Sequence, residues 1–261
     1  MPSTSGKVKV SSDGRFLIVS GVYPPQIRVY ELSELSMKFE RHLDAEIVQM
    51  EILSDDFSKM VFLRDDRTLE FHARYGTHHK VRVPRFGRDL GYQRSVCDLY
   101  VVGASSEAWR INLEQGRFLK GIDTNLPEIN CCQVNPAHEL LAFGGIDGVV
   151  ELYDPRDRER IAQLDIPQSV LTHSESQLDG LEQAEISCLR FDVDGLTLGV
   201  GTSSGQVLLY DIRSRVPLAV NDHRYGLGIK NILFHQASNK ILSVDSKILK
   251  FWDRSSVSLL K

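Results

Sequence analysis

The sequence predicts an all-β fold, a β-propeller with six recognisable repeated units, and two observations lead to this prediction. The first is a strand–turn–strand pattern at residues 140–156, where Asp147-Gly148 separates two apolar runs. Asp-Gly favours a hairpin turn because glycine accepts a positive φ at no cost and aspartate tolerates it. The runs are nearly continuous, so both faces are expected to be buried between similar units. Residues 197–213 repeat the pattern, with Ser204-Gly205 at the turn.

The second observation is the repeat length. An aromatic or apolar residue closes one strand of each unit, and these residues are about 40 apart with one interval of about 57: Tyr30, Phe71, Ile111, Tyr153, Tyr210 and Trp252. Such a period is typical of the four-stranded propeller blade of WD-repeat proteins. The long interval predicts an insertion at about 168–183, a polar and acidic stretch. The whole chain, residues 1–261, is expected to form one propeller domain.

Earlier strands complete the units. Strand-like segments occur at 7–10, 47–52, 186–191 and 229–234, and turn signals rich in Ser, Asp and Gly follow the first three. No long helical periodicity interrupts the pattern.

The number of units raises the question of closure, because WD propellers most often have seven blades. An open ring would expose four or five large aliphatic side chains on each of two faces, a loss of about 10 kcal/mol per face. This equals the net stability of many domains, about 5–15 kcal/mol. Either six blades close, or the chain is part of a longer one, or a partner covers the gap; a longer chain is favoured.

Composition excludes several function classes. The net charge of -4 gives no general attraction to nucleic acid or anionic membrane, so any such binding requires a local patch. No apolar run approaches the length of a membrane span, and residues 1–6 do not resemble a signal peptide. The four cysteines show no CxxC spacing, which favours free thiols in the cytosol or nucleus and disfavours zinc. His78-His79 has no neighbouring carboxylate and is expected to be solvated.

Several residues are expected to have structural roles typical of WD repeats. Three units end in an aromatic residue followed by aspartate, where the aromatic ring fills the interface between blades and the aspartate caps the next turn: Tyr153-Asp154, Tyr210-Asp211 and Trp252-Asp253. The last unit also contains His223, Ser243 and Asp245 before Trp252. This spacing predicts the buried Asp-His-Ser-Trp hydrogen-bond network of WD repeats, and Asp147 has a similar position in its own unit.

No catalytic constellation is present. Gly199 to Gly205 is rich in glycine but lies in a strand–turn–strand setting without a following helix, so a phosphate loop is not expected. The sequence contains neither HExxH nor G-x-S-x-G. We therefore expect no enzymatic activity, no catalytic or metal-binding residues, no cofactor and no small-molecule substrate.

One basic stretch stands above this background. Between residues 80 and 94, five cations and two aromatic residues occur with a single acid: Lys80, Arg82, Arg85, Phe86, Arg88, Tyr92 and Arg94. Arginine binds phosphate or carboxylate in a bidentate manner, and aromatic rings stack on unpaired bases. The stretch is either a solvated connection between the second and third blades or a loop that contacts RNA or an acidic partner.

Six strings, found from the second unit to the last, resemble one family: Leu53–Lys59, Pro84–Asp89, Val102–Glu107, Asn112–Arg117, Gly205–Asp211 and Asp222–Leu227. The chain is similar in these strings to the nucleolar protein ten / Enp2 family, WD-repeat proteins of the small-subunit processome. Relative to that family, the chain is expected to be truncated at both ends.

The resemblance implies a non-enzymatic scaffold in the nucleolus that acts in 18S ribosomal RNA maturation and assembly of the 40S subunit. It further implies that the partners are other processome proteins and pre-ribosomal RNA.

A second hypothesis belongs to another class. The Tyr-Asp-x-Arg strings that end at Arg156 and Arg213 resemble the motif by which WD-repeat substrate receptors dock to cullin-type ubiquitin ligases. Binding of such an adaptor, abolished by Arg156→Ala and Arg213→Ala, would favour this hypothesis.

Overall fold

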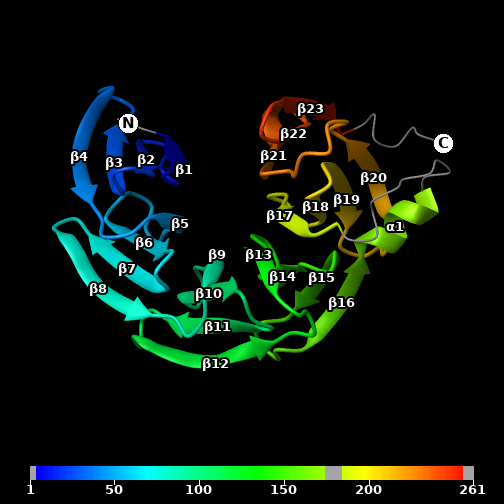
Figure 1. The fold of residues 1–261 in the computed structure, drawn as a ribbon, viewed down its shortest axis with the longest axis horizontal. Helices are drawn as coiled ribbons and strands as arrows, with labels where there is room; N and C mark the ends of the chain where they lie inside the picture. The colour runs from blue at the N-terminus through cyan, green and yellow to red at the C-terminus, as the bar shows by residue number, and fades with distance from the viewer. Residues whose placement is uncertain (1–3, 174–183, 255–261) are drawn as a thin grey trace. The chain divides into compact units, whose positions relative to one another are not determined.

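The computed structural model describes residues 4–173 and 184–254 and is almost entirely β-structure (Figure 1). The predicted insertion therefore lies partly in residues 174–183, outside the described residues. The first three sheets contain β1 Ser5–Val10, β2 Phe16–Gly21, β3 Gln26–Glu31, β4 Ser36–His42, β5 Ile47–Ile52, β6 Lys59–Arg64, β7 Thr68–Ala73, β8 Gly76–Arg82, β9 Gly87–Gln93, β10 Asp98–Gly103, β11 Glu107–Asn112 and β12 Arg117–Asp123. The next three contain β13 Ile129–Val134, β14 Leu141–Gly145, β15 Val149–Tyr153, β16 Arg160–Asp165, β17 Ile186–Phe191, β18 Thr197–Thr202, β19 Gln206–Asp211, β20 Pro217–Asp222, β21 Asn231–His235, β22 Lys240–Val244 and β23 Leu249–Asp253.

The strands form six consecutive antiparallel meanders. Five sheets have four strands, and in the described residues the last has three, β21 to β23. Every predicted anchor residue lies in the third strand of its sheet, from Tyr30 in β3 to Trp252 in β23. The all-β class and the six repeated units are therefore confirmed.

Two hairpins show why these residues form these turns. Gly148 and Gly205 have φ values of 77° and 90°, in the region where a side chain is strained. Each glycine lies between the second and third strands of its sheet, as predicted from Asp147-Gly148 and Ser204-Gly205. The polar neighbour stabilises the first turn, because Asp147 Oδ1 accepts a hydrogen bond from the Val149 N–H at 3.3 Å.

The chain divides into two compact units. The first comprises Met1–Ala104 and Arg110–Leu119, and the second comprises Ser105–Trp109 and Lys120–Lys261. The division passes through the third sheet.

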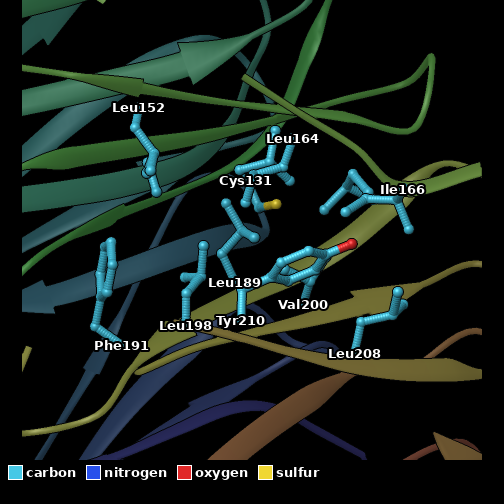
Figure 2. Packing of buried hydrophobic residues seen from close by; sticks show 13 residues of the cluster. Cys131, Leu152, Leu164, Ile166, Leu189, Phe191, Leu198, Val200, Leu208 and Tyr210 are labelled. Carbon is cyan, nitrogen blue, oxygen red and sulfur yellow. The ribbon is translucent and has the colours of Figure 1, made fainter. Parts of the chain in front are cut away.

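The core of the second unit lies between the fourth and fifth sheets. Leu152 and Leu164 from the fourth sheet pack in one cluster with Leu198, Leu208 and Tyr210 from the fifth (Figure 2). Burial of these side chains on facing sheets explains the nearly continuous apolar runs of the sequence. In the first unit, a corresponding cluster joins the first and second sheets, with Ile18 and Phe62 fully buried.

Glycine permits the close approach of neighbouring strands in this core. A Cβ atom at Gly144 would lie 2.7 Å from Cys131 Sγ and 2.6 Å from Ile186 Cγ2. The next sheet repeats the arrangement, because a Cβ at Gly201 would lie 2.5 Å from Cys188 Sγ and 2.9 Å from Ile229 Cβ.

A short α-helix, α1 Ile166–His173, follows β16, and a 3₁₀ turn spans Gln236–Ser238. The sequence did not predict α1. It begins at Ile166, two residues before the predicted insertion at about 168–183, and it contacts β16 and β20 (Figure 1).

Candidate functional site: a basic connection and a buried hydrogen-bond network

The basic stretch from Lys80 to Arg94 forms two strands with a short connection between the second and third sheets. Of the two predicted alternatives, a connection between blades and a contact loop, the continuous loop is therefore wrong. β8 ends at Arg82, residues 83–86 connect the sheets, and β9 begins at Gly87. A seven-residue strand such as β9 spans about 20 Å, so its two ends lie at opposite ends of the sheet along the strand direction. The seven predicted contact residues therefore cannot form one surface.

The main chain of the connection is held in place on both sides. The Val83 N–H donates to the Arg67 carbonyl at 2.8 Å, and the Ala104 N–H donates to the Phe86 carbonyl at 2.9 Å. Gly103 permits the second contact, because a Cβ there would lie 2.0 Å from the Phe86 carbonyl oxygen. The connection is therefore a preorganised support for its exposed side chains.

Four residues at and near the connection between β8 and β9 form a surface that we call the arginine–phenylalanine patch: Arg67, Arg82, Arg85 and Phe86. The Phe86 ring is 59% exposed, and the Arg67 guanidinium carbon lies 5.3 Å from its centroid. Arg67 Nη1 also donates to the Pro84 carbonyl at 3.3 Å. Arg82 and Arg85 are exposed, and neither forms an ion pair with another described residue. Two guanidinium groups beside an exposed ring can therefore bind an external anion.

Sequence reasoning missed Arg67, which lies between β6 and β7 and not in the basic stretch. The signal that could have found it is topological. In a four-stranded meander the second and fourth strands end on the same side of the sheet. The turn between the second and third strands therefore lies at the same end as the connection to the next sheet.

The other residues of the predicted set have different surroundings. Arg88 is exposed in β9. Lys80 Nζ lies 2.9 Å from Asp44 Oδ2, and this hydrogen bond raises the pKa of the Lys80 ammonium. At the opposite end of β9, Arg94 Nη1 lies 2.7 Å from Asp55 Oδ1. Tyr92 is half-buried, and burial is the largest cause that raises its pKa to about 12.

A buried ionic cluster lies in the same sheet as β8. Arg64 Nη1 donates to Glu70 Oε2 at 2.6 Å, and His72 Nε2 lies 3.1 Å from the other oxygen of Glu70. Burial raises the pKa of the Glu70 carboxyl, but hydrogen bonds from Arg64, His72 and Thr77 outweigh it, so this pKa is lowered overall. Burial lowers the pKa of His72. Glu70 therefore compensates Arg64 in the interior and is unavailable to a ligand.

The structure brings the four residues of the predicted network in the last sheet together. His223 Nδ1 lies 3.1 Å from Asp245 Oδ2, and its Nε2 lies 2.5 Å from Ser243 Oγ. Trp252 Nε1 donates to Ser243 Oγ at 2.8 Å. With a proton on Nδ1, His223 donates to Asp245 and its Nε2 accepts from Ser243. His223 and Ser243 are fully buried. Because His223 follows β20, the network joins the connection after the fifth sheet to β22 and β23 of the last.

Three predicted aspartates can be compared at the ends of their strands. Asp154 Oδ1 accepts from the Arg156 N–H at 2.9 Å, and Asp211 Oδ1 accepts from the Arg213 N–H at 2.9 Å. Asp253 Oδ1 lies 4.0 Å from Lys240 Nζ.

The two predicted tyrosines are both buried. Tyr153 donates from its hydroxyl to Glu151 Oε2 at 2.9 Å, whereas Tyr210 belongs to the cluster between the fourth and fifth sheets. Burial is the largest cause that raises the pKa of Tyr210 to about 12.

The described residues contain no group of three or more His, Cys, Asp or Glu side chains placed to bind a metal ion. In the same part of the chain, no helix has the length and apolar character needed to cross a membrane.

The comparison with known protein families shows to which family the chain belongs. A β-propeller family model described as "Nucleolar protein 10-like, N-terminal domain" matches residues 1–260. The chain belongs to this family. The predicted resemblance is therefore confirmed, and so is the β-propeller fold class.

Individual family members show the same relationship. The chain is 49% identical over 256 residues to nucleolar protein 10 of Homo sapiens and 48% identical over 256 residues to that of Danio rerio. It is 41% identical over 253 residues to ribosome biogenesis protein ENP2 of Saccharomyces cerevisiae. These matches cover 98%, 98% and 96% of the chain but 37%, 35% and 34% of the respective relatives. The chain thus spans little more than a third of the length of these relatives.

Proposed function

We propose that this chain acts in ribosome biogenesis as a non-catalytic scaffold of the small-subunit processome, in 18S ribosomal RNA maturation and 40S subunit assembly. The names of its relatives support the coarser part of the proposal, because the yeast relative is called a ribosome biogenesis protein and the human one a nucleolar protein. The nucleolus is the proposed location for the same reason. Other processome proteins and pre-ribosomal RNA are the proposed partners.

The arginine–phenylalanine patch is the observation that carries the RNA contact. Arginine side chains without an acidic partner favour phosphate, and an exposed ring offers a stacking surface for an unpaired base. In the patch, Arg67 lies over the ring of Phe86 at 5.3 Å, while Arg82 and Arg85 are exposed. The net charge of -4 makes this local concentration of cations significant, because the chain as a whole repels a polyanion.

The test reverses the charge of the exposed arginines. A double variant of the patch, Arg82→Glu and Arg85→Glu, is compared with a control variant of equal charge change, in which Arg117 and Lys120 are replaced by Glu. All four residues are exposed. Each variant is tagged, recovered from nuclear extract at increasing salt with and without ribonuclease, and assayed for pre-ribosomal RNA and processome proteins.

We expect the patch variant to lose pre-ribosomal RNA at lower salt than the wild type, and the control variant to retain it. Loss of two phosphate contacts would reduce the slope of log affinity against log salt by about 1.4 for single-stranded RNA. Equal recovery of both variants and the wild type, with unchanged unfolding midpoints, would refute the RNA contact. Recovery of no processome protein with the wild type would refute the scaffold role.

Phe86→Ala separates stacking from charge attraction. Because a stacked base contributes about 1–3 kcal/mol in comparable proteins, we expect weaker RNA binding with an unchanged salt slope. An unchanged affinity would show that the ring is not used. The names of the relatives give no support to the ubiquitin-ligase hypothesis, and Arg156 and Arg213 are exposed residues whose main-chain N–H groups close local turns.

A further inference from the structure

The fourth sheet, which belongs to the second unit, has an open edge strand. The strand order is β13-β14-β15-β16, so in the described residues β16 has a sheet neighbour on one side only. On its other side the main-chain N–H and C=O of Gln163 are free to pair with another extended segment. β16 follows Tyr153-Asp154 and precedes α1, and no role for it was apparent from the sequence.

The register shows which main-chain groups face the open edge. The Ile166 N–H donates to the Gly148 carbonyl at 3.2 Å, and Leu164 and Ala162 are the partners of Val150 and Leu152. In an antiparallel sheet both main-chain groups of a residue point to the same side, and successive residues alternate. Residues 162, 164 and 166 therefore face β15, and Gln163 faces outward. The register shifts at Ile161, between the pairs Ala162–Leu152 and Arg160–Tyr153, and the Asp165 carbonyl accepts from Ser169 Oγ.

The edge of β16 also forms one wall of a groove of about 610 Å³. All six residues of β16 line this groove, and Gln168 and Ser169 of α1 contribute to its other wall. Helix α1 is anchored there, because Asp165 Oδ1 accepts from the Gln168 N–H at 3.1 Å and Ser169 Oγ donates to the Asp165 carbonyl at 2.6 Å. A strand edge facing a helix is the arrangement in which peptide-binding domains add an extended peptide to a sheet.

The charges of the groove are separated along its length. Arg160 begins β16, and Arg215, from the connection between β19 and β20, also lines the groove. Arg160 is compensated internally, because its Nη1 lies 2.7 Å from Glu151 Oε1. Arg215 is exposed and forms no ion pair with another described residue. At the other end of β16, Asp165 provides a carboxylate.

From these observations we propose that the groove binds an extended peptide segment of a partner protein, which pairs with β16 as a fifth strand. The segment carries an acidic residue that pairs with Arg215. Ile161, which is 56% exposed, provides apolar contact for a β-branched side chain. An antiparallel peptide would place its carboxyl-terminal end beside Arg160 and its amino-terminal end beside Asp165.

The test uses a synthetic peptide and the purified chain. The probe is a fluorescein-labelled peptide of sequence Lys-Val-Thr-Val-Thr-Val-Glu, and its affinity is measured by fluorescence anisotropy. Two control peptides accompany it. One has lysine and glutamate exchanged, and the other has N-methyl groups on alternate residues, which removes the N–H donors of one edge.

Two variants address the two parts of the proposal. Arg215→Glu replaces attraction to the acidic residue of the probe by repulsion and should lower the affinity for the probe about tenfold. Its matched control is Arg213→Glu, an exposed arginine of the same connection that does not line the groove, and it should bind like the wild type. Gln163→Pro removes an outward N–H from the edge strand without removing a hydrogen bond to β15, and it should weaken the probe more than tenfold.

Hydrogen exchange gives an independent readout. The outward amide of Gln163 should gain protection when the probe binds to the wild type, and the N-methylated peptide should confer none. Failure of the probe to bind the wild type would overturn the proposal. Equal affinity for Arg215→Glu and the wild type, or binding without protection of this amide, would also overturn it. Unfolding midpoints of all variants exclude loss of binding through misfolding.

Discussion

Gly103→Ala tests whether the close contact beneath the arginine–phenylalanine patch is required. A Cβ atom at this position would lie 2.0 Å from the Phe86 carbonyl oxygen, 2.8 Å from Gly87 Cα and 2.9 Å from the Phe86 carbonyl carbon. All three are main-chain atoms, so a side-chain rotation cannot relieve the clash. The two strands must separate, and the hydrogen bond from the Ala104 N–H to the Phe86 carbonyl must break.

The expected change in the free energy of unfolding follows from these two effects. Overpacking of a rigid interior costs about 1–3 kcal/mol, and the lost hydrogen bond contributes about 1 kcal/mol. We therefore expect Gly103→Ala to lower the free energy of unfolding by about 2–4 kcal/mol. The chain should still fold, because a typical domain has about 5–15 kcal/mol of stability. Phe86 should be displaced, so RNA binding by the patch should weaken as well.

Urea unfolding and hydrogen exchange measure the two consequences. The free energy of unfolding reports the overall cost, and exchange of the Ala104 amide reports the broken hydrogen bond. Gly116→Ala is the matched control, since no atom lies within 4 Å of its Cβ position and its φ of 65° predicts a cost of only about 1 kcal/mol. If Gly103→Ala were within about 0.5 kcal/mol of the wild type with full protection of the Ala104 amide, the reasoning from close contact would be wrong.

Three further perturbations test the second unit. Ser243→Ala removes the buried hydroxyl between two hydrogen-bond partners, so the free energy of unfolding, followed by Trp252 fluorescence, should fall by about 2–4 kcal/mol. Burial raises the pKa of Tyr210 to about 12, whereas an unfolded tyrosine ionises near pH ~10. The folded state therefore keeps the proton longer, and stability should fall as the pH rises from about 10 to about 12 in the wild type but less in Tyr210→Phe. Leu208→Ala, which removes a fully buried side chain, should cost about 2–5 kcal/mol, against about 0.5 kcal/mol or less for Leu218→Ala, whose side chain is 54% exposed.

The sequence was sufficient to predict the fold class because its signals are repeated. Strands buried on both faces produce apolar runs, and the recurrence of one run every forty residues identifies the unit even where single strands are ambiguous. The predicted strands at 47–52 and 186–191 coincide with β5 and β17, and that at 229–234 differs from β21 Asn231–His235 by two residues or fewer. The turns with glycine at positive φ were predictable for the same reason, since residue type decides them locally.

The candidate site was less predictable, because it depends on which residues meet across strands. The basic stretch was correctly noted as rich in arginine, but linear proximity placed Arg82 and Arg94 together, whereas β9 separates them. Arg67 was missed because it comes from the preceding hairpin. Helix α1 was missed because eight residues are too few for a clear helical period.

Buried polar residues explain a further property that apolar patterns leave open, the register of the strands. Met60, Val61, Phe62 and Leu63 of β6 are all buried, so a shift of one residue against β7 would still place apolar side chains on both faces. The same shift would separate Arg64 from Glu70 and leave a buried charge without its partner, which is strongly unfavourable.

Other sheets also contain a buried polar pair between neighbouring strands, but the residues differ. In the third sheet Arg110 Nε donates to the buried Asp98 at 2.6 Å, and in the fourth Arg160 compensates the buried Glu151. In the last sheet Trp252 Nε1 of β23 donates to the buried Ser243 Oγ of β22 at 2.8 Å. The apolar residues therefore decide that the chain forms stacked antiparallel sheets, and in these four sheets the buried polar pairs determine how two neighbouring strands are aligned. Since the pairs differ from sheet to sheet, they produce no repeated pattern in the sequence from which they could be predicted.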